Sequence, residues 1–237
     1  MFDKFFTTEV SGEVISSIIA MAIIAILAII VGIQAHFHDP LKKPKGLLLI
    51  AEIGVKFFDN FVEGLMGTAM PGFGGIVMCC GVYLFVAFIF GLTGLPSPVT
   101  YMAVPLSLGL VAFMCIHITS IRFTKWRYFK RYVEPFPMFL PINLISMWAP
   151  VLSLTLRLFG NAVAGMTLMS LLYAFLGGVG TTLFEVAGEA VHVGTFVAPV
   201  VTSILHAFFD LFSGFIQTTV FISLMTIFTA QEIPETE

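Results

Sequence analysis

Apolar residues run along this chain in long blocks separated by short polar stretches. Three blocks, at residues 14–35, 75–95 and 101–121, each have about the length that an α-helix needs to cross a membrane. Two later blocks, at 136–176 and 193–231, would each be about 60 Å long as one helix, twice the hydrocarbon thickness. Each long block is therefore either two spans or one steeply tilted helix, and composition does not decide between them.

Residues 47–66 follow a different pattern, in which polar side chains recur every three or four positions. The polar positions are Glu52, Lys56, Asp59, Asn60 and Glu63. This spacing places them on one face of a helix, with apolar side chains around the rest. We expect this helix to lie along the cytoplasmic surface of the membrane. The alternative is a tilted span that lines a protein interface.

The composition is typical of a membrane protein. Of the 237 residues, 58% are hydrophobic and 11% are charged, against about 25% charged in soluble domains. We therefore expect one all-α polytopic membrane domain over residues 1–237, with about five transmembrane helices and one surface helix. Nucleic-acid binding has no support, because the sequence has no broad basic face with interleaved aromatic residues. Three cysteines, all within apolar blocks, argue against a disulfide framework.

Basic residues gather in two loops, at 36–46 and 122–134. The positive-inside rule assigns both loops to the cytoplasmic side. The two assignments agree, because two spans joined by a charge-free turn lie between the loops. The N-terminus is then external and the C-terminus cytoplasmic.

The stretch 177–192 contains acidic residues but no lysine or arginine, and we expect it to be an external loop. Glu185 and Glu189 are either solvated loop charges or groups at the mouth of an ion path. His192 lies beside them.

Arg157 is the only charged residue in the block 136–176. An arginine at membrane depth costs about 2.5–3.5 kcal/mol on insertion scales, and a guanidinium does not deprotonate in proteins. Ser153 and Asn161, four residues away on either side, share its helix face. The last block has a second polar stripe with spacings of three and four, which consists of Ser203, His206, Asp210, Ser213 and Gln217.

The two stripes predict a hydrated seam, because polar positions in membrane segments face a pathway or another helix rather than lipid. Plainer interpretations remain open. Arg157 and Asp210 are also compatible with a buried structural ion pair. Asn161 and Gln217 are also compatible with hydrogen bonds that only pack helices together.

The hexapeptide Leu156-Arg-Leu-Phe-Gly-Asn161 resembles the signature of subunit a of F-type ATP synthases. The resemblance extends from about Gly46 to the end of the chain. Further features that carry it are Ser97-Pro98 at the start of a span, the basic loop after Ile121, Pro141-Ile-Asn-Leu-Ile145, and Gln217 seven residues after Asp210.

This resemblance implies a stator subunit beside a rotating ring of c subunits, each with a carboxylate at mid-membrane. The subunit would supply two half-channels, and Arg157 would be the essential cation beside the ring. The two long blocks would be steeply tilted helices along the ring. The ion path would involve the polar residues named above, which are Asn161, Ser203, His206, Asp210, Ser213, Gln217, Glu185, Glu189 and His192.

The resemblance also implies partners and a location. The partners would be the c ring, b-type peripheral stalk subunits, membrane lipid and, indirectly, the catalytic head. The chain would be no enzyme by itself, would need no cofactor or metal, and would lie in a bacterial plasma (inner) membrane. The rival hypothesis is a secondary transporter or solute channel, which predicts internal repeats with broken helices; the sequence contains no such repeat.

Three positions depart from the family pattern. Met166 stands where many relatives have a carboxylate or histidine, Asp210 where histidine or glutamate is frequent, and Ser146-Met147-Trp148 where a glutamate is frequent. With Met166 inert, Asp210 and His206 are the candidates for the external half-channel. They are one helical turn apart and can share a proton. The choice between H⁺ and Na⁺ rests mainly with the ring.

Overall fold

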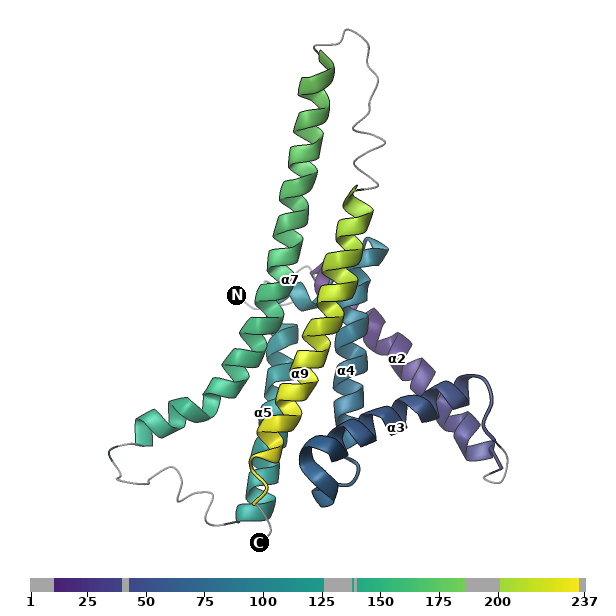
Figure 1. Cartoon of the computed structure of the whole chain (residues 1–237), viewed down its shortest axis with the longest axis vertical. Helices are drawn as coiled ribbons and strands as arrows, with labels where there is room; N and C mark the ends of the chain where they lie inside the picture. The colour runs from purple at the N-terminus through teal and green to yellow at the C-terminus, as the bar shows by residue number, and fades with distance from the viewer. Residues whose placement is uncertain (1–10, 40–42, 126–137, 139, 186–200, 235–237) are drawn as a thin grey trace, which may run out of the picture.

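The computed structural model describes the chain apart from residues 1–10, 40–42, 126–137, 139, 186–200 and 235–237. The described residues contain helices and no β-strand (Figure 1). Five of these helices are long and apolar enough to cross a membrane. The prediction of an all-α polytopic membrane protein is thereby confirmed.

The described elements follow one another in a simple order along the chain. In order they are α2 (Gly12–Phe37), α3 (Leu47–Met66), η1 (Gly67–Ala69), α4 (Phe73–Ile89), η2 (Phe90–Thr93), η3 (Pro98–Thr100), α5 (Ala103–Thr124), α7 (Leu140–Glu185), η5 (Ala207–Phe212) and α9 (Ser213–Ala230). Residues 201–206 are also helical and lead directly into η5.

The first long block is one helix rather than two spans. α7 runs without interruption from Leu140 to Glu185, although Pro150 lies inside it. Proline removes a backbone hydrogen bond and crowds the preceding turn, which bends a helix. Figure 1 shows α7 changing direction between its lower and upper parts. α7 also continues beyond residue 176, its predicted end, because the glycines there weaken a helix without ending it.

The second long block is described from residue 201 onwards, and its residues 193–200 lie outside the described part. From Val201 to Ala230 it is again a single helical span. Figure 1 shows this span beside α7, with the chain running in the opposite direction.

α4, α5 and α9 form the centre of the bundle, and small residues let them approach closely. A Cβ on Gly214 of α9 would lie 2.7 Å from Cβ of Phe88 in α4. Gly109 of α5 faces Val151 and Thr155 of α7 in the same way. Membrane helices pack through such small residues, because water supplies no hydrophobic driving force there. The glycines thus set the spacing of the helices that hold the functional side chains.

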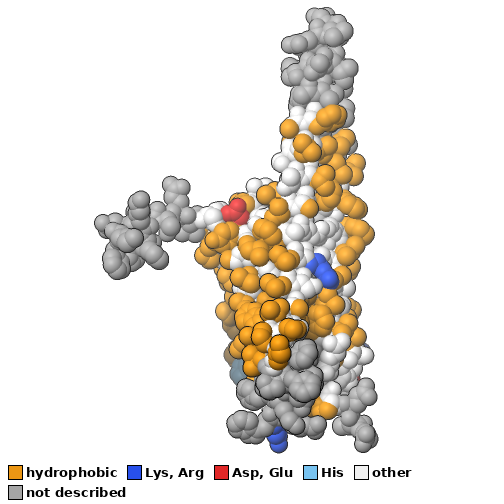
Figure 2. Space-filling view, turned by 90° about the vertical axis from the view of Figure 1, so that its left-hand side faces the viewer, with side chains coloured by type: hydrophobic (Ala, Val, Ile, Leu, Met, Phe, Trp, Pro, Cys, Tyr) orange, Lys and Arg blue, Asp and Glu red, His pale blue; other side chains and the backbone are white. Residues whose placement is uncertain are grey.

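α7 is the least covered of the described spans. Of the 18 residues in its most apolar stretch, 11% are buried, against 39% in the corresponding stretches of α4, α5 and the last span. Val151, Leu154 and Leu158 pack into the bundle, while Leu152 and Leu156 are more than half exposed. Figure 2 shows apolar side chains along this side of the molecule. The open face of α7 therefore meets either lipid or another protein.

α3 differs from the five spans in both composition and direction. Figure 1 shows it lying across the lower part of the bundle rather than alongside the spans. Val62 and Met66 are buried against the bundle, and Lys56 pairs with Glu52 on the exposed side. Asp59 contacts Gly74 of α4. This helix has the amphipathic pattern predicted for it, and it is not one of the candidate spans.

Candidate functional site

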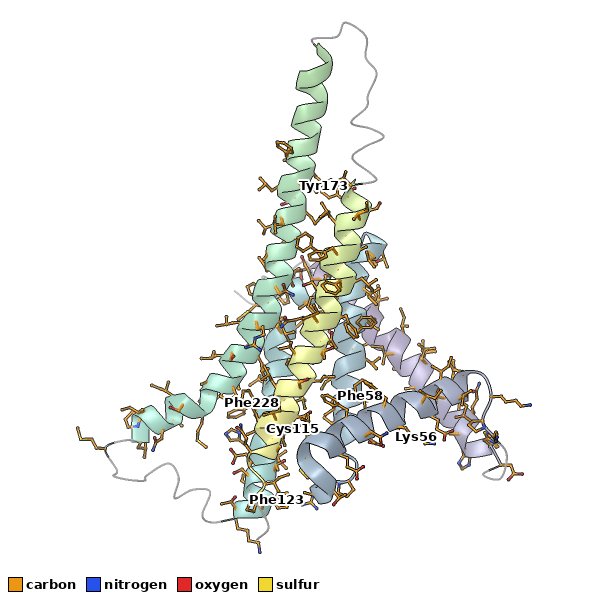
Figure 3. All side chains as sticks on the ribbon, viewed as in Figure 1. Lys56, Phe58, Cys115, Phe123, Tyr173 and Phe228 are labelled. Atoms are coloured by element: carbon orange, nitrogen blue, oxygen red, sulfur yellow. The ribbon has the colours of Figure 1, made fainter. Side chains whose placement is uncertain are left out.

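Three side chains form a hydrogen-bonded chain between α7 and the last span. Tyr173 Oη lies 2.8 Å from His206 Nε2, and Nδ1 of the same ring lies 2.7 Å from Asp210 Oδ2. The histidine and aspartate side chains are 30% and 24% exposed. Figure 3 places Tyr173 toward the upper end of the bundle, opposite Phe123 and Phe228. Both ring nitrogens of His206 thus have a hydrogen-bond partner, and part of the His206 and Asp210 side chains remains exposed.

A second contact fixes how α7 and α9 lie against each other. Asn161 Nδ2 donates a hydrogen bond to Ser213 Oγ at 2.8 Å. Because the two helices are antiparallel, one turn back on α7 is matched by one turn forward on α9. Arg157 therefore lies level with Gln217 along the seam.

Asp210 lies in a turn of π-helix, η5. A π turn is wider than an α turn, because each N–H bonds five residues back, and such turns are frequent at functional sites. The structure departs here from the single regular stripe that the spacing predicted. Ser203 is exposed, His206 and Asp210 are half-buried, and Gln217 is buried. The wider turn rotates the later residues relative to the earlier ones, so the stripe passes from the surface into the bundle.

A cavity of about 270 Å³ opens beside the hydrogen-bonded chain. Its wall includes Met166, whose side chain has no titratable group, and Gly91 of η2. A Cβ on Gly91 would lie 3.0 Å from the Asp210 carboxylate, so glycine leaves the carboxylate its space. The lining also includes Ser97 and Thr100, whose hydroxyls both donate to backbone carbonyls. The aspartate thus faces a small, mostly apolar space between three parts of the chain, in which it and His206 are the titratable groups on the side of the last span.

Arg157 lies on the exposed side of α7. Its guanidinium has no hydrogen bond or ion pair with any residue that the structure describes. Asp210 bonds to His206 instead, so the ion pair considered from the sequence does not form. Gln217 is buried, and its Nε2 has no partner among the described residues. The seam therefore holds a permanent cation and an amide that both lack a partner within this part of the chain.

The other predicted residues are not part of this cluster. Ser153 is exposed on α7, and Glu185 is the last residue of that helix rather than a loop residue. Glu189 and His192 lie outside the described residues. Across the ranges that the structure describes, no group of three His, Cys, Asp or Glu side chains could hold a metal ion.

Tyr173 is the member of the cluster that sequence reasoning missed. It stands seven residues after Met166, which is two helical turns along the same face of α7. This spacing could have pointed to Tyr173 from the sequence, because it places the phenol on the same face of α7 as Met166, which has no titratable group.

The fold and the cluster together define a class, namely all-α polytopic membrane proteins in which two long antiparallel helices enclose a polar seam. Within this class, the chain belongs to the family described as ATP synthase A chain, whose model matches residues 14–230.

Curated relatives agree with this assignment over most of the chain. The ATP synthase subunit a of Mycoplasmoides gallisepticum is 28% identical, over 96% of this chain and 80% of its own length. The subunit a of Limosilactobacillus fermentum is 29% identical, over 85% of this chain and 84% of its own. That of Sulfurihydrogenibium sp. is 25% identical, over 93% of this chain and 97% of its own. The similarity thus includes both long helices and the seam between them.

Proposed function

We propose that this chain is the ion-translocating stator subunit of an F-type ATP synthase and that the ion is the proton. The observation that carries the proposal is the position of Arg157 on the open face of α7, where no described residue forms a hydrogen bond or ion pair with it. The partners are a ring of c subunits against that face, b-type peripheral stalk subunits, and the catalytic head through the complex.

Arg157 acts as a fixed cation beside a ring carboxylate. A carboxylate turns through lipid only when it is neutral, and a nearby cation favours its ionised form. The guanidinium keeps its own proton, so it holds the ring carboxylate ionised without becoming a proton donor. It also separates the two half-channels, so protons cross only when the ring turns.

The external half-channel runs through the seam above Arg157. His206 and Asp210 are half-buried, hydrogen-bonded to each other, and border the cavity. An imidazole and a carboxylate in contact can pass a proton between them. Asn161 and Gln217 lie further along the seam, where they orient the groups around Arg157. The ion path from the cytoplasmic side reaches the ring on the other side of this cation.

The open face of α7 supports the position of the ring. α7 and the last span both expose large apolar side chains, and Leu156, directly before Arg157, is 56% exposed. A ring of hydrophobic hairpins would cover these side chains and bring its carboxylates to the arginine. The bend at Pro150 lets α7 follow a curved partner.

One contact supports the orientation of the chain in a bacterial plasma membrane. Ser120 Oγ donates to Glu232 Oε2 at 2.7 Å, so Glu232 lies beside the end of α5 that leads into the basic loop 122–134. Basic loops remain on the cytoplasmic side. The C-terminus and α3 are then cytoplasmic, and the Tyr173 end of α7 is external.

ATP-driven acidification of membrane vesicles tests the proposed function. Arg157→Gln removes the cation and keeps a shorter, uncharged polar side chain, so we expect acidification to be lost while the complex still assembles. Assembly is checked by recovery of the ring with this chain. Normal acidification by the Arg157→Gln complex would contradict the proposal.

A further inference from the structure

The clearest feature that the proposed function leaves unexplained is the phenol of Tyr173. Its oxygen contacts Nε2 of His206 at 2.8 Å, and the two ring centroids are 6.0 Å apart. Tyr173 also lines the cavity of about 270 Å³ beside Asp210. Tyr173 as a whole is 50% exposed, so it stands at the boundary between the bundle and its surroundings.

We propose that Tyr173 is the α7 residue of the external half-channel, where it positions His206 and connects it to water. This inference rests on the proposed function. When the phenol donates to Nε2, that nitrogen accepts and the ring proton lies on Nδ1, which donates to Asp210. The tautomer of a histidine is set in this way by the partner of its other nitrogen.

The same geometry allows a balanced proton hop. A hydronium ion in the external water gives a proton to the phenol oxygen and leaves a neutral water molecule, while the phenol gives its own proton to Nε2. Nδ1 then releases its proton to the Asp210 carboxylate. The carboxyl group is now neutral and can pass the proton on toward a carboxylate of the c-subunit ring. No proton is gained or lost by Tyr173 or His206 over the whole step, and the hydrogen bonds reform when the histidine and tyrosine reorient.

The surroundings leave this task to Tyr173. Among the described residues, the titratable groups that hydrogen-bond to His206 are Tyr173 from α7 and Asp210 from its own helix. The wall formed by η2 and η3 adds Ser97 and Thr100, whose hydroxyls are engaged with backbone carbonyls and do not titrate near neutral pH. Met166, on the same face of α7, has no proton to exchange.

Tyr173→Phe removes the hydroxyl and keeps the ring, and passive proton conduction through the head-stripped membrane sector in vesicles measures the result. We expect conduction to fall roughly two- to tenfold, as for loss of one neutral hydrogen bond. We also expect its dependence on pH between 6 and 9 to change, which a purely structural role of the ring would not cause. Tyr83→Phe is the matched control, because it loses a hydroxyl bonded to Ser17 at 2.7 Å outside this cavity.

A double-substitution cycle locates the effect. If Tyr173 acts through the histidine, Tyr173→Phe should have little further effect when His206 is already alanine. If Tyr173→Phe lowers conduction by the same factor in the His206→Ala background as in the parent, the proposal is overturned. If the Tyr173→Phe complex does not assemble, Tyr173→Gln is used in its place, because its amide keeps a hydrogen-bond donor for His206. The Tyr173→Gln sector should conduct protons better than a Tyr173→Leu sector. Equal conduction by these two variants would overturn the proposal.

Asp210→Asn separates the failure of this inference from failure of the proposed function. Parental conduction by Tyr173→Phe together with impaired conduction by Asp210→Asn would overturn the role of Tyr173 alone. Parental conduction by Asp210→Asn would overturn the path through the seam, and the role of Tyr173 with it.

Discussion

The amide of Asn161 donates a hydrogen bond to Ser213 at 2.8 Å and so sets the register between α7 and α9. One turn away in each helix, this register places Arg157 level with Gln217. Arg157 is exposed and Gln217 is buried. At this level of the seam the guanidinium therefore lies on the outer side and the amide on the inner side. Four expected outcomes follow from this arrangement and its surroundings.

Replacing Arg157 with lysine should abolish most ATP-driven pumping. An ammonium shifts its pKa readily in a low-dielectric site and can release its proton, whereas a guanidinium does not. A deprotonated lysine no longer holds a ring carboxylate ionised or blocks leakage. Vesicle acidification measures pumping, and passive conduction measures the leak. Pumping at the parental rate by Arg157→Lys would show that a permanent charge is not required.

Asp210→Asn should reduce passive proton conduction by at least about tenfold, in the range of effects expected when a proton-transfer group is removed. Met166→Ala should leave conduction near the parental level, because it removes only an apolar wall. His206→Ala should change the pH dependence of conduction, since imidazole is the side chain that titrates near neutral pH. Equal conduction by the Asp210→Asn and Met166→Ala sectors would contradict the role of Asp210 in the proton path.

Gly214→Ala should destabilise the bundle by about 1–3 kcal/mol, the usual cost of overpacking a close contact. The added methyl would meet Phe88 at 2.7 Å between Cβ atoms, and these lie too near the backbone to move aside. Gly32→Ala in α2 is the control, because nothing lies within 4 Å of its Cβ position. Thermal unfolding in detergent measures both. A Gly214→Ala protein as stable as Gly32→Ala would mean that α4 and α9 are not packed so closely.

Single cysteines in a background without Cys79, Cys80 and Cys115 should report the orientation. Lys43→Cys and Lys125→Cys should react with a membrane-impermeant thiol reagent only from the cytoplasmic side, because basic loops stay inside. A cysteine at position 189 should react only from outside. Labelling of position 43 or 125 from outside would reverse the proposed topology.

The sequence was sufficient for the architecture because membrane spans are encoded locally, in runs of apolar residues whose length matches the bilayer. The amphipathic pattern of α3 was local in the same sense. The sequence did not decide whether each long block was one helix or two. Pro150 and the glycines near the end of α7 lower its local helix stability, but the continuous backbone hydrogen bonding of a helix outweighs their cost.

The site was less accessible from sequence. The spacing of His206 and Asp210 placed them one turn apart, and the structure brings them into contact. The contact of Tyr173 with His206 joins residues 33 positions apart, and no local pattern contains the register between their helices. The π turn was likewise hidden, because a wider turn depends on packing around the helix and leaves no regular spacing of its own.

The π turn at Ala207–Phe212 gives this helix tolerance to a change in chain length. A π turn contains one residue more than an α turn over a similar rise. Removal of one residue here would let the helix close into α turns, while Thr202 before it and Gly214 after it could keep their buried places. The groups that face the cavity would rotate, but the packed residues would not. A single-residue deletion between 207 and 212 would therefore change which side chains line the path and spare the bundle that supports them.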